Sequence, residues 1–166
     1  MQMVDFDFKD EIVKVDFSLN YCYQCGTCSS ACPVAFATLG EFNPRKIIEE
    51  SILGLRDLLI KEQTPNVWLC STCQMCVEEC PQGVLLTQIF ENLRNKIVNT
   101  GQEYPEPFKA QAKSILENSL AIPLSQPIRR RREQLGLPNL KFADVKEVNK
   151  LLDKTNFKKK LNLNGD

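Results

Sequence analysis

Histidine is absent from all 166 residues of this sequence. Its absence excludes Rieske-type ligation, histidine-bound zinc and histidine acid–base chemistry within this chain. Lysine plus arginine and aspartate plus glutamate both number 21, so the chain lacks the basic field expected of a nucleic-acid-binding domain. No stretch approaches the ~20 apolar residues that cross a bilayer, and the first residues show no signal-peptide pattern. The chemistry of this chain therefore has to come from other side chains, and the cysteines are the candidates.

All eight cysteines lie in two runs with one spacing, Cys-x2-Cys-x2-Cys-x3-Cys-Pro, and none lies outside them. Thiolates are soft, strongly donating ligands, and four of them at this spacing can hold one [4Fe-4S] cluster. In two-cluster proteins with such runs, the fourth cysteine of each run ligates the other cluster. The sequence therefore predicts two [4Fe-4S] clusters with crossed ligation.

The crossed arrangement divides the eight candidate metal ligands into two sets. Cluster 1 is expected on Cys22, Cys25, Cys28 and Cys80, and cluster 2 on Cys70, Cys73, Cys76 and Cys32. Gly26 can take a positive φ, which lets the backbone fold tightly and point amide groups at sulfur. Tyr21 and Trp68 stand just before the first cysteine of each run, where packing against a cluster is expected. No catalytic residue is predicted.

Disulfides and zinc are the competing uses of these cysteines. A disulfide framework is typical of small secreted chains, usually with a denser cysteine content. Paired Cys-x2-Cys units also form tetrahedral zinc sites, so a zinc-stabilised interaction module is the stronger alternative. Zinc gives no reason, however, for the repeated third and fourth cysteines with a following proline. Thiols that stay reduced and the lack of a targeting segment predict a cytoplasmic protein.

Apolar periodicity predicts mainly helical structure after the first residues. Residues 4–8 and 13–17 alternate apolar and polar side chains, which predicts two short strands. Asn43 is expected to cap a helix that begins at Pro44, and Gly101 to follow the end of a later helix. Amphipathic helices are predicted over residues 44–62, 84–98, 107–120, 127–135 and 143–152.

These elements predict a mainly α protein, with a helical domain that binds two [4Fe-4S] clusters and a short N-terminal β-like extension. The expected domains are an extended segment at 1–18, the cluster domain at 19–122 and a C-terminal helical extension at 123–166 that docks on a partner. The run Arg129–Arg132 in this extension is interpreted as a solvated helix face or as a set of partners for carboxylates on another protein. Nucleic-acid binding is not expected.

Three segments carry a resemblance to a known family: Tyr21–Pro33 around the first cysteine run, Asn43–Lys46 at the following helix, and Trp68–Cys73 at the second run. With them the chain resembles the helical two-cluster ferredoxins, as in the iron–sulfur subunits of succinate dehydrogenase and fumarate reductase. Within that group it is most similar to the C-type iron–sulfur subunit of the CoB–CoM heterodisulfide reductases of methanogenic archaea. All eight cysteine ligands of the family match residue for residue.

The resemblance implies an α-helical ferredoxin fold and a role as a non-catalytic electron-transfer subunit of an oxidoreductase complex. Such a protein carries electrons through two [4Fe-4S] clusters from a flavin-containing A-type subunit to a catalytic B-type subunit. The catalytic partner reduces the CoM-S-S-CoB heterodisulfide in methanogenesis, the flavin of the A-type subunit splits electron pairs, and a nickel–iron hydrogenase joins the larger complex. The alternatives are a relay subunit of another cytoplasmic oxidoreductase and the zinc-stabilised module.

Overall fold

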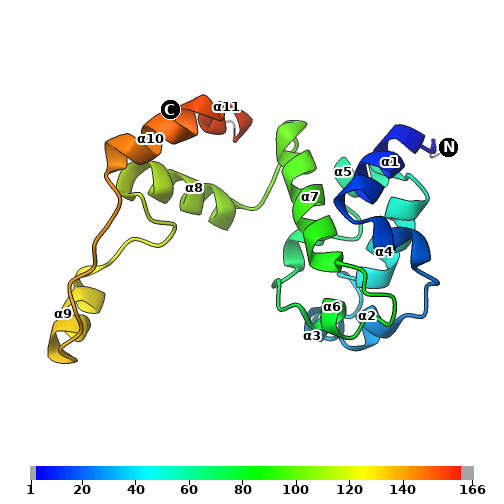
Figure 1. Cartoon of the computed structure of the whole chain (residues 1–166), viewed down its shortest axis with the longest axis horizontal. Coiled ribbons are helices and arrows are strands. Elements are labelled where there is room, and N and C mark those ends of the chain that lie inside the picture. Colours follow the sequence, from blue (N-terminus) through cyan, green and yellow to red (C-terminus); the bar gives the residue numbers. More distant parts are fainter. Residues whose placement is uncertain (1–2, 162–166) are drawn as a thin grey trace. The chain divides into compact units, whose positions relative to one another are not determined.

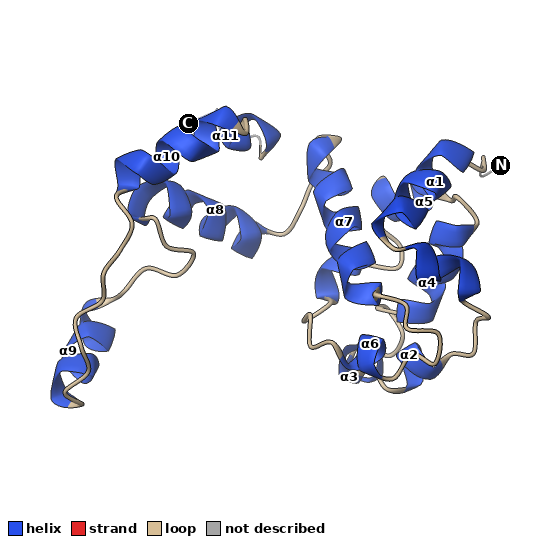
Figure 2. Ribbon diagram, in the orientation of Figure 1, coloured by secondary structure: helices blue, strands red, loops and turns tan. Residues whose placement is uncertain are grey.

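The computed structural model of the chain describes residues 3–161. Helices and loops make up this range, and no β-strand occurs within it (Figures 1 and 2). The chain divides into two compact units, Met1–Gln102 and Glu103–Asp166. The helix expected over 107–120 belongs to the second unit. The mainly helical class is confirmed.

The first unit contains both cysteine runs. Its short helices α2, α3 and α6 follow cysteines of the two runs and lie together at one end of the unit in Figure 1. The longer helices α1, α4 and α7 form most of the remaining body. In chain order the elements are α1 (Phe6–Val15), the 3-10 turn η1 (Phe17–Tyr21), α2 (Thr27–Ser30), α3 (Pro33–Ala37), α4 (Pro44–Ile52), α5 (Arg56–Ile60), the 3-10 turn η2 (Val67–Leu69), α6 (Met75–Glu78) and α7 (Leu86–Asn99).

The N-terminal segment is helical, so the prediction of two strands at 4–8 and 13–17 is wrong. Asp5 caps helix α1, and its side chain accepts a hydrogen bond of 2.9 Å from the amide of Phe8. Phe8 and Ile12 lie one helical turn apart and are both buried, whereas Phe6 is 70% exposed. An N-cap followed by an i, i+4 apolar pair favours a helix, and this signal prevails over the alternation along the chain.

Helix α4 begins as predicted and ends earlier. Asn43 is its N-cap, accepts a hydrogen bond of 3.1 Å from the amide of Lys46, and is followed by Pro44 in the first turn. The helix predicted to continue to residue 62 stops at Ile52, and a separate helix α5 resumes after a turn at Gly54, where φ is +69°. A glycine in the left-handed region ends a helix at little steric cost, which separates α4 from α5.

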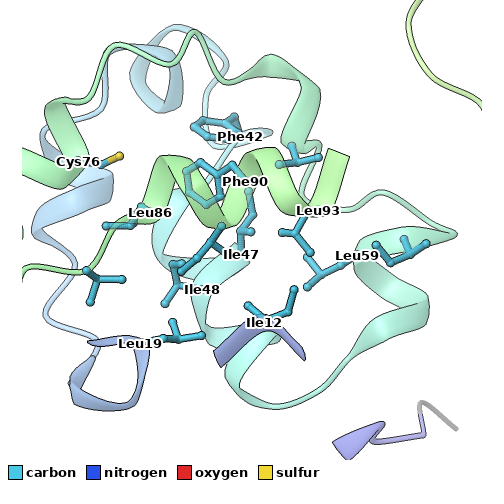
Figure 3. Packing of buried hydrophobic residues seen from close by; sticks show 14 of the residues in the cluster. Ile12, Leu19, Phe42, Ile47, Ile48, Leu59, Cys76, Leu86, Phe90 and Leu93 are labelled. Carbon is cyan, nitrogen blue, oxygen red and sulfur yellow. The ribbon is translucent and has the colours of Figure 1, made fainter. Parts of the chain in front are cut away.

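A single apolar core joins the helices of the first unit. Figure 3 shows Ile47 and Ile48 of α4 close to Phe90 and Leu93 of α7, with Ile12 of α1 below Ile48 and Leu93 in this view. The rings of Phe42 and Phe90 meet edge to face at 5.8 Å. Two cysteines also belong to the buried cluster, Cys32 and Cys76. The apolar core and the cysteine runs are therefore one continuous structure.

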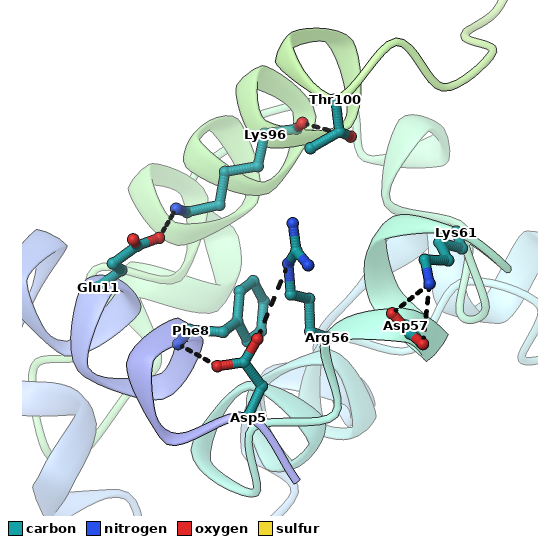
Figure 4. Close-up of polar contacts among 8 residues, drawn as sticks. All are labelled: Asp5, Phe8, Glu11, Arg56, Asp57, Lys61, Lys96 and Thr100. Atoms are coloured by element: carbon teal, nitrogen blue, oxygen red, sulfur yellow. Dashed lines mark hydrogen bonds and ion pairs between the residues drawn. The ribbon is translucent and has the colours of Figure 1, made fainter. Parts of the chain in front are cut away.

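Polar contacts at the surface connect α1 with its neighbours (Figure 4). Glu11 on α1 forms an ion pair with Lys96 on α7, and this pairing lowers the pKa of Glu11. Asp5 lies 4.0 Å from Arg56 at the start of α5. Exposed ion pairs contribute little each, so the buried face of α1 carries most of its attachment.

The second unit contains α8 (Glu106–Asn118), α9 (Gln126–Gln134), α10 (Val145–Lys154) and α11 (Phe157–Lys160). The side-chain amide of Asn149 on α10 donates a hydrogen bond of 2.9 Å to the carbonyl of Leu116 on α8. Ala112 and Ser114 of α8 are buried, but α9 has no buried residue. The helices predicted at 107–120, 127–135 and 143–152 are confirmed to within about two residues at each end. None of the helices in the described range has the length and apolar character needed to span a bilayer.

Candidate metal centres

Two cavities in the first unit bring the eight cysteines together. The first cavity is lined by Cys22, Cys25, Cys28 and Cys80. The second cavity is lined by Cys32, Cys70, Cys73 and Cys76. Each cavity thus combines the first three cysteines of one run with the last cysteine of the other. The assignment of these thiols as cluster ligands stays a prediction. The observation that supports it is the grouping of four cysteines at each cavity.

The two runs share one backbone conformation. Gln24 and Thr72, at matching places in the first Cys-x2-Cys unit of each run, have φ values of 61° and 54°. Gly26 and Gln74, which follow the second cysteine, have φ values of 84° and 68° and begin the short helices α2 and α6. Two left-handed residues in close succession turn the chain sharply, so three cysteines face one cavity. The positive φ predicted for Gly26 is confirmed.

Five of the cysteine sulfur atoms make hydrogen-bond contacts, and four of these accept from a defined donor. Backbone amides donate to three of them at 3.4 Å: Thr72 to Cys70, Ala35 to Cys32 and Val84 to Cys80. Side chains contact two more: Gln24 Nε2 donates to Cys22 at 3.5 Å, and Thr27 Oγ1 lies 3.3 Å from Cys25 Sγ. Donors aimed at thiolate sulfur draw charge from it, which tunes the potential of a bound cluster.

The thiols differ in how deeply they are buried. Cys32 and Cys76 are buried, whereas Cys25 and Cys73 are exposed, one at each cavity. Burial raises the pKa of Cys76 to about 12. The contact with Thr27 lowers the pKa of Cys25. A buried thiolate needs a nearby positive charge, and ferric or ferrous iron supplies it, so four thiols around each cavity fit an iron–sulfur cluster.

Helix α4 presents side chains to the first cavity, and helix α7 presents side chains to both. Arg45 of α4 lines the first cavity and lies 3.6 Å from Glu49, with the Arg45 side chain 41% exposed. Thr87 of α7 lines the second cavity and donates a hydrogen bond of 2.8 Å to the side chain of Gln74. The longer helices of the unit therefore contribute directly to the surroundings of the cysteines.

Comparison with known proteins agrees with this site. Residues 18–84, which include all eight cysteines, match the 4Fe-4S dicluster domain. The second C-type iron–sulfur subunit of the CoB–CoM heterodisulfide reductase of Methanocaldococcus jannaschii is 34% identical, over 90% of this chain and 79% of its own length. The C-type subunit of the H2:CoB–CoM heterodisulfide,ferredoxin reductase of Methanothermobacter marburgensis is 30% identical, over 98% and 89%. This chain belongs to the family of heterodisulfide reductase iron–sulfur subunits of the C type.

As a member of this C-type family, the chain is an iron–sulfur electron-transfer subunit of an oxidoreductase complex. The C-type subunit of the ferredoxin:CoB–CoM heterodisulfide reductase of Methanosarcina mazei is also similar, with 33% identity over 81% of this chain and 83% of that protein. The family relationship extends beyond the cysteine runs, since these alignments cover residues of both compact units.

In this C-type chain, the segment that leads into the second cysteine run is held by Arg94 of α7. Its guanidinium donates hydrogen bonds to the carbonyl oxygens of Val67 at 3.0 Å and Cys70 at 2.6 Å. It also lies over the ring of Trp68, 5.6 Å from the ring centroid. Arg94 therefore binds the backbone of a cysteine that lines the second cavity.

Sequence patterns did not identify every residue around the cavities. Neither Tyr21 nor Trp68 lines either of the two cysteine cavities. Tyr21 is 58% exposed, and Trp68 contacts Arg94 and Gln63. Arg94 carries no local motif, so only the tertiary structure reveals its contacts. The positive φ of Gln74 was predictable from the sequence, because Gln74 aligns with Gly26 when the two cysteine runs are superimposed.

Proposed function

We propose that this chain relays electrons through two [4Fe-4S] clusters, from a flavin-containing A-type subunit to a catalytic B-type subunit that reduces the CoM-S-S-CoB heterodisulfide in methanogenesis. Reduction of that disulfide takes two electrons and two protons and yields two thiols, and each cluster passes one electron at a time. The sorting of the cysteines into two groups of four, within a member of the C-type family, carries the proposal.

The proposed ligands follow the crossed arrangement. Cysteines 22, 25, 28 and 80 hold cluster 1, and cysteines 70, 73, 76 and 32 hold cluster 2. This assignment uses every cysteine of the chain and leaves no free thiol to attack a disulfide. The chain is accordingly non-catalytic, and its chemistry is outer-sphere electron transfer.

Electrons enter and leave through the exposed side of each cavity. Cys25 at the first cavity and Cys73 at the second are both exposed, so each cluster has a ligand at the surface where another redox protein can approach. Aromatic side chains flank the first of these surfaces: Tyr21 is 58% and Tyr23 is 59% exposed. A face with a cluster ligand and exposed aromatic residues suits a docking partner.

The second unit is proposed to dock on a partner protein of the complex. Helix α9 has nine residues, none of them buried, and an isolated helix of this length is not stable in water. The segment around it exposes apolar side chains, with Ile122 at 71% and Leu135 at 59%. A partner surface that covers these side chains and pairs carboxylates with Arg129–Arg132 would stabilise this segment.

The electron source of the complex belongs to other subunits. Relatives of this chain are named for hydrogen in Methanothermobacter marburgensis and for ferredoxin in Methanosarcina mazei. A nickel–iron hydrogenase in the larger complex is the donor we propose here, with flavin-based electron bifurcation at the A-type subunit. The cytoplasm, where thiols stay reduced, is the compartment that suits eight thiolate ligands.

Anaerobic purification with metal and sulfide analysis tests the proposal. About eight irons per chain, with acid-labile sulfide and a paramagnetic signal after dithionite, are expected for two [4Fe-4S] clusters. Zinc without iron would instead identify a zinc-stabilised interaction module. Co-purification from native extract is expected to yield a flavoprotein and a disulfide-reducing protein. Capture of a different set of oxidoreductase components would assign the relay to another complex.

A further inference from the structure

Arg94 of α7 attaches the backbone of the Cys70 segment to that helix. Arg94 Nη2 donates hydrogen bonds to the carbonyl oxygens of Val67 at 3.0 Å, Trp68 at 3.5 Å and Cys70 at 2.6 Å. The Nε atom of Arg94 also contacts the Val67 carbonyl, at 3.3 Å. These carbonyls belong to or directly follow the single turn η2, and carbonyls at the end of a helical turn need partners from outside it.

The same guanidinium places a permanent positive charge beside the backbone of Cys70, a residue that lines the second cavity. Arg94 is half-buried, and it reaches this cavity through the Cys70 backbone rather than as a lining side chain. The guanidinium of an arginine stays protonated at neutral pH. A charge at a half-buried site is screened less by water and salt than a charge at the surface.

The cation at the first cavity, Arg45, makes different contacts from Arg94. The Arg45 side chain is 41% exposed, and its guanidinium lies 3.6 Å from the carboxylate of Glu49 rather than on a cysteine carbonyl. Its approach to the first run is through the Arg45 Cδ atom, 3.7 Å from the position of a Cβ at Gly26. The exposed carboxylates Glu78 and Glu79 lie in sequence between Cys76, a ligand of cluster 2, and Cys80, a ligand of cluster 1. Their negative charges therefore give no reason for a difference between the two clusters.

We infer that Arg94 is a positioning residue for Cys70 whose positive charge raises the reduction potential of cluster 2 selectively. The inference rests on the proposed function, because it requires a cluster at the second cavity. Adding one electron makes a cluster more negative by one charge, and a nearby cation stabilises that reduced form. The hydrogen bonds place the charge next to a ligand of cluster 2, so its influence on cluster 1 is weaker.

Two substitutions separate the charge of Arg94 from its hydrogen bonds. Arg94→Gln removes the charge and keeps donors that can reach a carbonyl, whereas Arg94→Lys keeps the charge and loses the planar fork. Arg45→Gln removes a cation at the first cavity and is the matched control. Potentials are measured by electron paramagnetic resonance during anaerobic redox titration of the purified full chain. Cys25→Ser and Cys73→Ser identify the two signals, because each changes a ligand of one cluster.

The expected result is a lower midpoint potential for one cluster in Arg94→Gln, with the other cluster unchanged, and a value near the wild type in Arg94→Lys. The shifted signal is the one altered by Cys73→Ser. Equal shifts of both clusters, or no shift in a protein that retains both, would overturn the inference. Absence of iron–sulfur signals in the wild-type chain would instead refute the proposed function itself. If Arg94→Gln does not assemble cluster 2, the midpoint potential of cluster 2 is measured in Arg94→Met instead. A wild-type potential in an assembled Arg94→Met protein would overturn the inference.

Discussion

Cys32 and Cys80 hold the same position in the two cysteine runs, and each lines the cavity formed by the other run. Each is followed by a proline and accepts a backbone amide hydrogen bond of 3.4 Å, from Ala35 and Val84 respectively. The exchange brings two stretches of chain into each cavity, so neither run could form its site without the other. Clusters bound there would also cross-link the first unit.

The crossed arrangement predicts opposite effects of two serine substitutions. Cys32→Ser is expected to perturb cluster 2 and leave cluster 1 intact, because Cys32 lies with Cys70, Cys73 and Cys76. Cys80→Ser is expected to perturb cluster 1 only. Electron paramagnetic resonance of the reduced proteins distinguishes the two outcomes. If each serine instead altered the cluster of its own run, the crossed ligation would be wrong.

Removal of iron is expected to abolish the cooperative unfolding of the first unit. Cys32 and Cys76 are part of its buried core, and clusters would occupy space and connect segments that are far apart in the sequence. Anaerobic chelation followed by circular dichroism during heating measures the change. Reconstitution with iron and sulfide is expected to restore the transition. A cluster-free protein that melts cooperatively at the temperature of the loaded protein would contradict this prediction.

Gly54→Ala is expected to destabilise the first unit by about 2–4 kcal/mol. A Cβ at Gly54 would lie 2.5 Å from the carbonyl oxygen of Asp5, and φ at Gly54 is +69°. The same region is the attachment point of α1, since the Asp5 amide donates a hydrogen bond of 2.9 Å to the Gly54 carbonyl. Gly83→Ala is the matched control. Its φ is +64° with no atom within 4 Å, so roughly 1 kcal/mol is expected.

Anaerobic denaturant titration, followed by the visible absorbance of the clusters and by circular dichroism, compares the two alanine variants. Equal losses would show that backbone strain alone accounts for both, and that the close approach of α1 to Gly54 does not matter.

Glu50 of α4 is expected to make stability decrease as pH rises. Its side chain is 5% exposed, and burial raises its pKa from 4.5 to about 7 despite Lys46 at 3.6 Å. Because the folded carboxyl keeps its proton to higher pH than the unfolded one, folding takes up a proton between these values. The contribution of the protonated Glu50 carboxyl to folding stability is therefore fully present below pH 4.5 and is lost as pH rises through about 7. The loss amounts to about 3 kcal/mol at most.

Glu50→Gln is expected to remove this pH dependence, because glutamine has the same shape and no ionisation. Unfolding free energies at pH 5 and pH 8 are the measurement, and Glu49→Gln, at a side chain that is 43% exposed, is the control. A slope that persists in Glu50→Gln would assign the effect to another group.

Charge reversal on α9 tests the docking role proposed for the second unit. Arg129 and Arg132 donate hydrogen bonds to the carbonyls of Leu124 and Pro138, whereas Arg130 and Arg131 are exposed. Arg130→Glu with Arg131→Glu is expected to weaken binding to the partner proteins at least about tenfold, more strongly at low salt. Lys150→Glu with Lys154→Glu on α10 is the control. Calorimetric titration with the separate partners measures both, and equal affinity of the two double variants would argue against a role for α9.

Local signals predicted those parts of the fold that depend on neighbouring residues. The cap at Asn43, the glycine at residue 101 beyond α7 and the helices of the second unit are short-range features, and the structure confirms them. The two predicted strands failed because alternation and helical spacing coexist in the first residues. There, the packing of Phe8 and Ile12 into the core decides between them.

The cysteine spacing by itself determined the donor set, because ligand type and interval are properties of the covalent chain. The family resemblance needed the segments Asn43–Lys46 and Trp68–Cys73 as well. The repeated runs also predicted the crossed grouping of the cysteines that the two cavities show. Only the tertiary structure decided where the chain divides into two units and that Arg94 reaches the carbonyl of Cys70. The reason is separation along the chain. Arg94 and Cys70 are 24 residues apart, and no periodicity links residues brought together by the packing of α7 against η2.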